Sequence, residues 1–510
     1  MKRFYTLLLA FVLSFSLYGQ TDSVFLLTYG GIQNDICNQI KPTYDGGYIM
    51  IGTSNSFGCG NTDFYAVKID SLGKYEWSRT YGGTENEEGF SVTPTFDHGY
   101  AFVGFTDSYG AGGYDIYLVK TDSMGNFQWQ RTYGGSDWDF GYSIQQVADS
   151  GFVICGQTYS YGAGNGDVYV IRTNKIGDTL WTRAIGGAGY DIGNAVCVEK
   201  NDSLYAIIGN TTSFGIGDTS VYFILMNNKG IVKKDTTYGC THSTIGNSIS
   251  VTLDKGFVVY GSLDSLPDST NAGTYCEMMI KTDSVGSMQW MQVYYNPSFP
   301  GVGIGKDAIQ EPDGTYVSIG TNNSSGSGVY GMHIQHLASP GWFMGATVFG
   351  GTVNAQGNSI AAAKNGNVIF AGSSDSPGYS QGLFDILVSL WKKDSIVNVY
   401  PFSVKNFYDT CYCTLGIASQ PIIYPEVKIF PNPVSTSTTI LVQGDIESHY
   451  FFNIFNSYGD CITKGTPLQP INHGQSIGHF EKGNLEAGVY LYEVFNQNNV
   501  KVAVGKLIVE

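Results

Sequence analysis

Acidic residues recur at a constant spacing along this chain, and they are the residues best suited to bind a ligand. One equivalent position of a repeated pattern holds Asp35, Glu87, Asp139 and Asp191, and another holds Asp63, Asp115 and Asp167. Carboxylates accept hydrogen bonds from hydroxyl and backbone N–H groups, and several converging oxygens bind calcium. We therefore treat the first set as candidate ligand-binding residues and the second as weak calcium candidates. The competing interpretation is structural: each carboxylate holds its own loop by accepting backbone N–H groups.

Aromatic residues in the same loops make a sugar the candidate ligand. Trp138 follows an acidic stretch, and Tyr109 and Tyr161 stand in two Gly-rich loops. Aromatic rings offer a large apolar face, and Tyr and Trp add a polar edge, which together suit the mixed surface of a sugar ring. The alternative is that each ring packs on its own turn. We therefore hypothesise a glycan-binding site that includes these three residues.

Sequence motifs of common catalytic sites lack the context that their chemistry requires. The G-x-S-x-G match at residues 474–478 has no strand-to-helix turn around it, and the Gly-rich residues 162–166 precede no helix. His333 and His336 are three residues apart in an expected strand, so they point to opposite faces and cannot pair as metal ligands there. Two carboxylates that approach each other could still act on a polysaccharide. A hydrolase or lyase therefore stays open as an alternative.

These residues sit in a long internal repeat. The Tyr of a TYGG landmark recurs at Tyr29, Tyr81 and Tyr133 with a period of 52 residues, and its equivalents continue at Ile185, Tyr238, Tyr294 and Phe349. A self-similar period of this length is typical of propellers, solenoids and arrays. The landmark therefore marks seven copies of one supersecondary unit.

Turn signals divide each copy into four strands. The first signal is a hairpin pair such as Asp97-His98-Gly99, and the second places a Gly three residues after Asp or Asn, as from Asp122 to Gly125. Both need residues that reach positive φ, and both join antiparallel strands. Between them, residues 90–96 and similar stretches alternate as strands do, with 90–96 expected innermost. Four strands repeated seven times predict an all-β fold, a seven-bladed β-propeller over residues 21–393.

The propeller topology sorts the loops onto two faces. The connections between second and third strands and those between blades are long and share one face, whereas the other face has only tight turns. Function is usually carried by loops on a rigid scaffold, so the long-loop face is the expected binding surface. The repeated tryptophans before the landmark, Trp77, Trp129, Trp181 and Trp290, are expected to pack between blades. Either residues 24–30 or residues 396–402 would complete the last blade.

Composition and the chain start indicate an exported protein. Residues 1–20 combine Lys2 and Arg3 with a short apolar run, which is typical of a secretory signal peptide. No later apolar run has membrane length, so no transmembrane segment is expected in the mature form. The formal net charge of -16 argues against nucleic acid as a partner, because phosphate binding needs clustered Lys and Arg. Buried free thiols are expected at Cys155 and Cys197, and a disulfide from Cys37 or Cys59 stays open.

After a linker over residues 394–426, a second unit of alternating strands begins. It carries Pro431-Asn432-Pro433 near its start, the run Phe455 to Gly459, Leu485, Gly488-Val489-Tyr490, and Lys506 in the final strand. Residues 427–510 thereby resemble the type A C-terminal sorting domain of type IX secretion, found in a group of Gram-negative bacteria. The family commonly ends in a basic residue, whereas this chain ends in Glu510.

The resemblance implies a small immunoglobulin-like β-sandwich that is recognised by the secretion translocon. It also implies export through the periplasm, removal by a sortase, and attachment to surface lipopolysaccharide or release. The sorting-signal residues would be Pro431, Asn432, Pro433, Gly459, Gly488, Tyr490 and Lys506.

Taken together, the sequence predicts a secreted or outer-membrane-surface binding or adhesion module, with a glycan as candidate ligand and calcium as the one cofactor considered. Two alternatives are a polysaccharide hydrolase or lyase on the long-loop face and a structural component of the surface coat. An enzyme should gather different, non-repeated polar residues at one mouth of the central channel. A binder should instead show one residue type on several blades.

Overall fold

The structure of the 510-residue chain is a computed structural model with strands and no α-helix among the residues it describes. The chain divides into two compact units, Met1–Gly416 and Ile417–Glu510. The predicted signal peptide and all of the predicted linker except 406–407 and 426 lie outside the described residues. The described ranges are 25–199, 203–239, 242–264, 275–294, 303–323, 330–349, 354–363, 366–375, 384–391, 406–407, 426–430, 435–443, 450–455, 461–472, 475–483, 485–496 and 501–509.

Seven antiparallel sheets form the described part of the first unit, and we number them in chain order. The first three are β2 (Asp35–Pro42), β3 (Tyr48–Ser54), β4 (Asp63–Ile69) and β5 (Tyr75–Tyr81); β6 (Glu87–Pro94), β7 (Tyr100–Thr106), β8 (Asp115–Thr121) and β9 (Phe127–Tyr133); and β10 (Asp139–Gln146), β11 (Phe152–Thr158), β12 (Asp167–Thr173) and β13 (Thr179–Ile185). The next three are β14 (Asp191–Val198), β15 (Leu204–Thr211), β16 (Ser220–Asn227) and β17 (Val232–Tyr238); β18 (Thr244–Val251), β19 (Phe257–Asp264), β20 (Tyr275–Thr282) and β21 (Met288–Tyr294); and β22 (Gly303–Gln310), β23 (Tyr316–Asn322), β24 (Gly331–Ala338) and β25 (Trp342–Phe349). The seventh holds β26 (Ala355–Ala362), β27 (Val368–Ser374), β28 (Asp385–Trp391), β1 (Phe25–Tyr29) and β29 (Asn406–Phe407).

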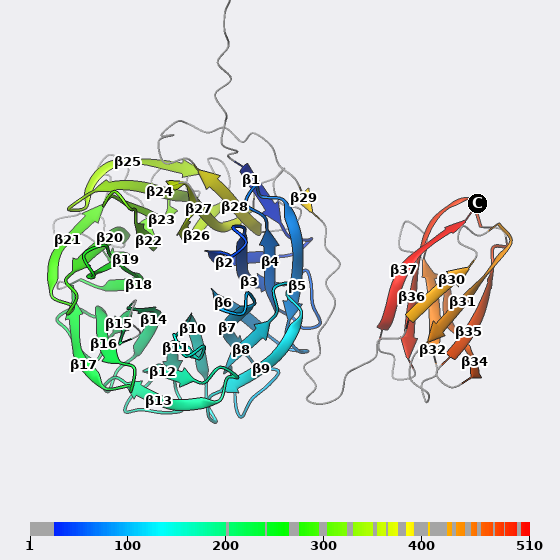
Figure 1. Cartoon of the computed structure of the whole chain (residues 1–510), viewed down its shortest axis with the longest axis horizontal. Coiled ribbons are helices and arrows are strands. Elements are labelled where there is room, and N and C mark those ends of the chain that lie inside the picture. The colour runs from blue at the N-terminus through cyan, green and yellow to red at the C-terminus, as the bar shows by residue number, and fades with distance from the viewer. Residues whose placement is uncertain are drawn as a thin grey trace, which may run out of the picture. The chain divides into compact units, whose positions relative to one another are not determined.

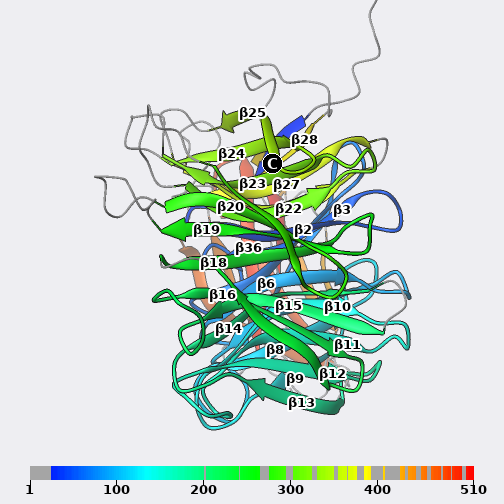
Figure 2. The same ribbon diagram turned by 90° about the vertical axis from the view of Figure 1, so that its left-hand side faces the viewer.

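The sheets stand around a common centre in a propeller-like ring, with the first strand of each sheet innermost (Figure 1). Turning the view by 90° shows the connections emerging on the two faces of the ring (Figure 2). The innermost strand of the second sheet starts at Glu87 rather than at residue 90 as expected, because the acidic position already pairs with Thr106. Every innermost strand carries a β-bulge at its fourth residue, such as Phe90 between Gly89 and Ser91.

The N-terminal strand closes the ring. β1 pairs antiparallel with β28, from Phe25 opposite Leu390 to Tyr29 opposite Ile386, and β29 adds a parallel strand outside it. Leu27 is buried in a core shared with the first sheet. Of the two segments considered from sequence, residues 24–30 therefore supply the closing strand. The other candidate, residues 396–402, lies outside the described residues.

Both predicted turn types are present. His98, Ser150 and Lys255 hold positive φ values of 65°, 68° and 65° at the centres of first hairpins, and Gly73 and Gly125 do so at 81° and 73° in the second turns. An L-residue reaches this region at a steric cost that Gly avoids, so these turns fix where each strand ends.

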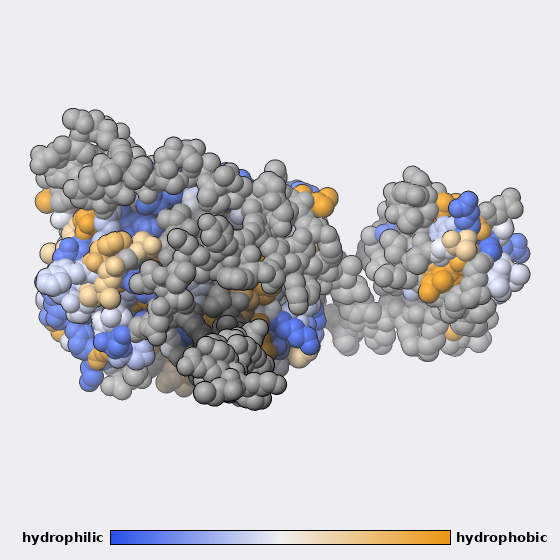
Figure 3. Space-filling view, turned by 90° about the horizontal axis from the view of Figure 1, so that it is seen from above, coloured by the Kyte–Doolittle hydropathy of each residue, from blue (hydrophilic) through white to orange (hydrophobic). Residues whose placement is uncertain are grey.

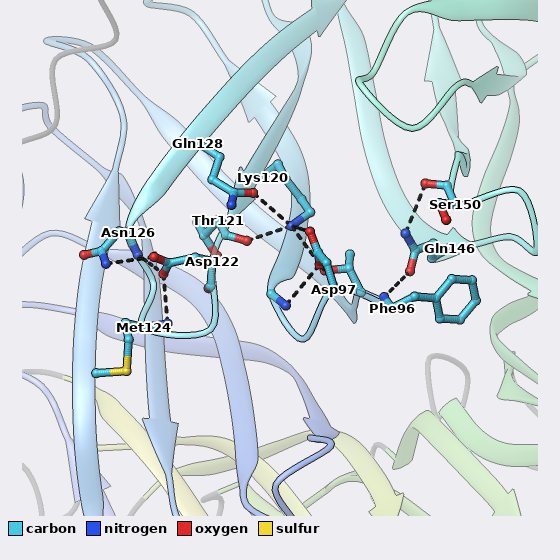
Figure 4. A network of polar contacts seen from close by, with 12 residues as sticks. Phe96, Asp97, Lys120, Thr121, Asp122, Met124, Asn126, Gln128, Gln146 and Ser150 are labelled. Atoms are coloured by element: carbon cyan, nitrogen blue, oxygen red, sulfur yellow. Dashed lines mark hydrogen bonds and ion pairs between the residues drawn. The ribbon is translucent and has the colours of Figure 1, made fainter. Parts of the chain in front are cut away.

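On the tight-turn face a buried cation ties the first hairpin to its sheet in the first, second, third and fifth sheets. Lys120 Nζ donates to Asp97 Oδ2 at 2.9 Å, to the Thr121 carbonyl at 2.8 Å and to Gln128 Oε1 at 3.1 Å (Figure 4). The same pairing recurs at Lys68–Asp45, Arg172–Asp149 and Lys281–Asp254. Because the ammonium is buried, these acceptors are needed to offset its lost hydration.

Apolar residues of neighbouring sheets interlock to form the core. One cluster joins Ile49, Phe64 and Ala66 of the first sheet to Phe102 and Val119 of the second. On the face shown in Figure 3, the described apolar side chains form small groups separated by hydrophilic ones.

The repeated tryptophans contribute to the same packing between sheets. Trp77 lies against Gly125 of the next sheet, and Trp129 lies against Gly177 in the same way. The predicted packing role of these tryptophans is confirmed for this pair.

The second unit contains two four-stranded sheets that share one hydrophobic core. One holds β30 (Glu426–Phe430), β31 (Ser437–Gln443), β35 (Gln475–Glu481) and β34 (Gln469–Asn472), and the other holds β33 (Cys461–Pro467), β32 (Tyr450–Phe455), β36 (Gly488–Asn496) and β37 (Lys501–Val509). The strands β33, β34 and β35 are short and largely polar, so they give weak strand signals in the sequence. Among the sorting-signal residues, Tyr490 is buried, Gly488 is exposed and Lys506 lies in β37. Pro431, Asn432, Pro433 and Gly459 lie outside the described residues.

Cysteine states follow burial. Cys37, Cys155, Cys197 and Cys276 are buried free thiols, as expected for Cys155 and Cys197. Cys59 is disulfide-bonded, so of the two candidates left open it is Cys59, and not Cys37, that forms a bridge.

Candidate functional site

The first set of acidic residues is buried at the long-loop ends of the innermost strands. Asp139 accepts hydrogen bonds from Gly135 N at 2.8 Å and from Ser160 Oγ at 2.7 Å. Asp35, Glu87 and Asp191 are also fully buried and each accepts the backbone N–H four residues before it. These carboxylates therefore hold the loops between sheets, which is the structural interpretation considered from the sequence.

The second set has a similar local role. Asp115 accepts from Ala111 N at 2.8 Å and Asp167 from Ala163 N at 2.9 Å, and Asp63 from Gly60 N at 3.0 Å. Burial raises the pKa of Asp115 and Asp167, and the neighbouring Asp139 and Asp191 charges raise it further. Among the described residues no group of three or more His, Cys, Asp or Glu side chains is placed to hold a metal ion.

Tyr109 and Tyr161 each join their own Gly-rich loop to the connection that precedes their sheet. The Tyr161 hydroxyl donates to the Gly134 carbonyl at 2.9 Å, and its ring lies 5.6 Å from that of Tyr169. The Tyr109 hydroxyl donates to the Gly82 carbonyl at 3.1 Å, and its ring packs on Tyr117. The rings thus pack locally, on the strand that follows their own loop, while their hydroxyls bond a different loop.

Trp138 instead joins a contiguous group of rings, which we call the aromatic cluster. Its centre is Phe140, whose ring lies 6.1 Å from Tyr142, 5.2 Å from Phe105 and 5.7 Å from Tyr114. Two members are open to solvent at the loop tips, Trp138 at 50% exposure and Tyr190 at 47%. The full cluster is Phe90, Phe105, Tyr114, Trp138, Phe140, Tyr142, Tyr159 and Tyr190.

The second and third sheets and the loops beside them supply these rings. Tyr159 connects the two exposed ends, since its centroid lies 6.2 Å from that of Trp138 and 6.4 Å from that of Tyr190. Phe90 and Tyr142 stand at the bulge positions of the innermost strands and meet edge to face at 5.3 Å. The aromatic cluster thus runs from the innermost strands to the loop tips of the long-loop face.

The other copies of the repeat show that the fold does not require aromatic residues here. Tyr159 N donates to the Trp138 carbonyl, and Asp107 N donates to the Asn86 carbonyl at the equivalent place. There the side chains also bond, with Asn86 Nδ2 3.0 Å from Asp107 Oδ2. Asn354 and Asp375 repeat this polar pair in the seventh sheet. We call this Asn–Asp pair the polar loop clamp. In the third sheet the ring contact between Trp138 and Tyr159 replaces it.

The residues at the β-bulges of the innermost strands also differ between the copies of the repeat. Four of them are asparagines that donate to a backbone carbonyl of the next sheet: Asn38, Asn194 and Asn247 to a glycine, and Asn358 to Cys37. Phe90 and Tyr142 replace this contact in the second and third sheets, and Lys306 does so in the sixth. Sequence reasoning selected Trp138 but missed the other members. The signal that could have found them is departure from the repeat at positions that are otherwise Asn or Asp.

The charge beside the aromatic cluster comes from Glu88. Burial raises the pKa of this carboxyl above its ordinary value. Burial, followed by the neighbouring Tyr159 and Glu88, also raises the pKa of the Tyr142 hydroxyl, which therefore stays a neutral donor at physiological pH. The site offers apolar ring faces with hydroxyl and carboxylate groups at their edges.

Among the described residues, no helix has the length and apolar character to cross a membrane. Comparison with known proteins adds one relative. The endo-acting ulvan lyase of Formosa agariphila is 34% identical over 88 residues, and the match spans 17% of this chain and 16% of the relative's length.

Solved structures match this chain at low sequence identity. The periplasmic gluconolactonase of Pseudomonas aeruginosa is 11% identical with a TM-score of 0.43, covering 70% of this chain and 96% of that one. An ulvan lyase of a polysaccharide lyase family, bound to an oligosaccharide, gives 11% identity and a TM-score of 0.43, covering 70% and 95%.

The family comparison concerns the second unit. Residues 428–510 match the model of the secretion system C-terminal sorting domain. This confirms the resemblance found at Gly488-Val489-Tyr490 and the other motif residues. The chain thus carries a type IX secretion sorting domain behind its repeats, and it is a protein exported to the cell surface or secreted.

Proposed function

We propose that this protein is a secreted or surface-bound seven-bladed β-propeller that binds a glycan through the aromatic cluster. Residues 21–393 form the propeller, and residues 394–426 link it to an immunoglobulin-like sandwich over 427–510. A signal peptide over residues 1–20 directs the chain to the periplasm. The type IX translocon and a sortase then deliver it to the surface, with attachment to lipopolysaccharide or release.

The observation that supports glycan binding is the replacement of the polar loop clamp by Trp138 and Tyr159. Exposing half of Trp138, and half of Tyr190 beside Tyr159, is unfavourable because it leaves apolar surface in water. The sheets that use Asn and Asp instead avoid this cost while keeping the same backbone. The rings are therefore better explained by a ligand than by the fold.

A sugar fits the chemistry of this surface. The C–H face of a sugar ring is apolar and packs on an aromatic face, while its hydroxyls bond to groups at the ring edges. Several rings in a row suit consecutive sugars of a polysaccharide. The relative named an ulvan lyase makes ulvan one of the first polysaccharides to test, alongside uncharged glycans.

The test is a glycan array probed with the full exported chain, with and without calcium, followed by calorimetry on each hit. Trp138→Ala should weaken binding about tenfold or more, as expected for loss of a central aromatic contact. Trp342→Ala is the matched control, since Trp342 is 66% exposed on β25 and outside the aromatic cluster. Equal affinity of Trp138→Ala and the parent chain would contradict the proposal. Loss of binding on calcium removal would revive Asp63, Asp115 and Asp167 as metal ligands.

Two other functions stay under test. Absence of any glycan ligand would favour a structural component of the surface coat. Chemical change of the bound glycan would favour a hydrolase or lyase.

A further inference from the structure

A second polar site lies between the fifth and sixth sheets, away from the aromatic cluster. Glu277 of β20 is its centre, with a relative exposure of 1%. Its Oε2 accepts the Tyr260 hydroxyl at 2.5 Å and the Gln335 side-chain amide, and its Oε1 lies 2.8 Å from Nδ1 of His333. Tyr260 comes from β19, whereas His333 and Gln335 come from β24 of the neighbouring sheet.

The first four copies of the repeat place apolar residues at the positions of Glu277, Gln335 and Tyr260, and a tyrosine at the position of His333. The register of the second and third strands aligns the copies, since Phe257 opposite Thr282 corresponds to Tyr48 opposite Ile69. By this alignment Glu277 stands where the other sheets have Phe64, Ile116, Val168 and Val221. Gln335 stands where they have Val67, Val119, Ile171 and Ile224, and Tyr260 where they have Ile51, Val103, Cys155 and Ile208.

Burial of Glu277 therefore lowers the stability of the fold in a way that the apolar residues of the other copies do not. Burying a carboxylate is strongly unfavourable unless several donors compensate, and replacing such a group by apolar residues is often neutral or stabilising. Tyr260, Gln335 and His333 supply those donors for Glu277. Departures of this kind from local rules are expected at functional sites.

Glu277 engages only one of the two ring nitrogens of His333. Glu277 engages Nδ1, which holds the proton on that nitrogen in the neutral ring and leaves the lone pair on Nε2. The His333 side chain is 13% exposed, whereas that of Glu277 is 1% exposed. Both residues are third in their strands, next to the ends that receive the long loops. His333 is thus the most exposed member of the group.

The charges around His333 suit reversible protonation. Burial lowers the pKa of this imidazole, but the charge and hydrogen bond of Glu277 outweigh burial and raise it above its ordinary value. The other titratable groups facing Glu277 are Tyr260, Cys276 and Tyr294, and burial raises the pKa of all three, so they stay neutral. Among the described residues, Glu277 is therefore the charged group that raises the pKa of His333.

We propose that His333 is the acid–base residue of a polysaccharide lyase site, with Glu277, Tyr260 and Gln335 as positioning residues. This inference rests on the proposed glycan binding and adds a reaction to it. The substrate class is a polysaccharide that contains uronic acid, because the C–H next to its carboxylate is the one that a general base deprotonates in a β-elimination.

The reaction is a β-elimination that needs no other reactant. Nε2 of His333 takes the proton from C5 of the uronic acid, and the electron pair forms a double bond between C4 and C5. The C4–O glycosidic bond breaks, and the departing oxygen takes the proton back from the imidazolium. The products are an unsaturated uronic-acid end and a free hydroxyl end, so atoms and charges balance.

Elimination fits the residues better than hydrolysis does. Glycoside hydrolysis commonly needs two carboxyl groups that reach the sugar, one as acid and one as base or nucleophile. Here the single carboxylate is buried and both of its oxygens are engaged, Oε1 by His333 and Oε2 by Tyr260 and Gln335. An imidazole that both accepts and returns one proton is sufficient for elimination.

The experiment incubates the full exported chain with ulvan, polygalacturonate and alginate and follows the ultraviolet absorbance of the unsaturated product. His333→Gln should lower the rate at least about 100-fold, the usual effect of losing an acid–base residue. The matched control is His336→Gln, which changes the other histidine of β24 and should keep the parent rate. Circular dichroism and thermal melting show that each variant is folded.

A pH profile tests the positioning role of Glu277. The base works when deprotonated, so the rate should rise with pH through the pKa of His333. Glu277→Gln removes the charge that raises this pKa, so the rising limb should move to lower pH by about one unit or more. A purely structural role would lower the rate without moving the limb.

Each outcome separates this proposal from the glycan-binding proposal. Product formed equally by the parent chain and His333→Gln would overturn the assignment of His333. A polysaccharide that binds, with binding lost in Trp138→Ala, but yields no unsaturated product would overturn the lyase site and keep the binding function. Absence of both binding and product would overturn both.

Discussion

Asp63 and Glu87 come from different sheets, and their carboxylates lie on either side of Gly82. A Cβ atom on Gly82 would stand 2.1 Å from Asp63 Oδ1 and 2.5 Å from Glu87 Oε2. Gly134 and Gly186 occupy the same place between the next two acidic pairs. The first Gly of each TYGG landmark is therefore the residue that lets two loop-holding carboxylates meet at a junction between sheets.

Replacing that glycine should destabilise the protein. In Gly82→Ala the new methyl group would force apart two short side chains that loop N–H groups hold in place. Overpacking of this kind typically costs about 1–3 kcal/mol of unfolding free energy. Urea denaturation measures the change. The control is Gly314→Ala, which has a φ of 89° but no heavy atom within 4 Å of the new Cβ, so it reports backbone strain alone.

The same pair predicts a pH dependence of stability. Burial and the Glu87 charge raise the pKa of Asp63 to about 6, whereas an unfolded Asp titrates near about 3.9. The folded state therefore takes up a proton within this window, and the stability contributed by Asp63 rises as pH falls from about 6 to 4 and is lost as pH rises again. The size is at most about 3 kcal/mol. Asp63→Asn should flatten this slope, and an unchanged slope would show that Asp63 does not titrate there.

The buried cations of the tight-turn face should stabilise more than surface pairs do. Asp97→Asn weakens the principal partner of Lys120 but leaves the Thr121 and Gln128 acceptors, and Asp97 itself is 56% exposed. We expect a loss of about 1–2 kcal/mol, less than for a fully buried pair. Asp178→Asn, which breaks the exposed 3.4 Å pair with Arg131, should change stability by less than about 0.5 kcal/mol. Thermal melts of the two variants side by side make the comparison, and equal losses would contradict it.

Closure by the N-terminal strand makes the first described residues important for stability. Leu27→Asp places a charge in the core shared by the first and seventh sheets, where Leu27 is 5% exposed. A loss of about 3 kcal/mol or more is expected, because an unpaired charge would be buried. Leu72→Asp, at a turn position with 66% exposure, should be nearly neutral. A stable Leu27→Asp variant would mean that another segment can close the ring.

Local patterns in the sequence identified the strands of the first unit well. The hairpin at His98 and the turn at Gly125 depend on residues within four positions, so turn chemistry alone located them. The innermost strand was started too late because the acidic residue at its head, Glu87, reads as a loop residue until its pairing with Thr106 is known. In the second unit, β33 to β35 carry too few apolar residues for their alternation to stand out.

The candidate sites were harder to foresee. Asp139 and Tyr161 looked like surface groups, yet the structure buries the first and ties the second to the Gly134 carbonyl. The sequence argued against His333 as a metal ligand because the neighbouring His336 points to the opposite face of the sheet. Its actual partner, Glu277, is 56 residues earlier and belongs to another sheet.

By itself the sequence determined the repeat, the turns that bound its strands and the sorting domain at residues 428–510, because each of these depends on residues close together in the chain. Only the tertiary structure decided that β1 closes the ring, that the repeated carboxylates are buried, that rings from two neighbouring sheets meet around Phe140, and that His333 meets Glu277. The physical reason is lateral packing. Neighbouring sheets bring together side chains about one repeat apart, and no pattern within a single strand records which of them will touch.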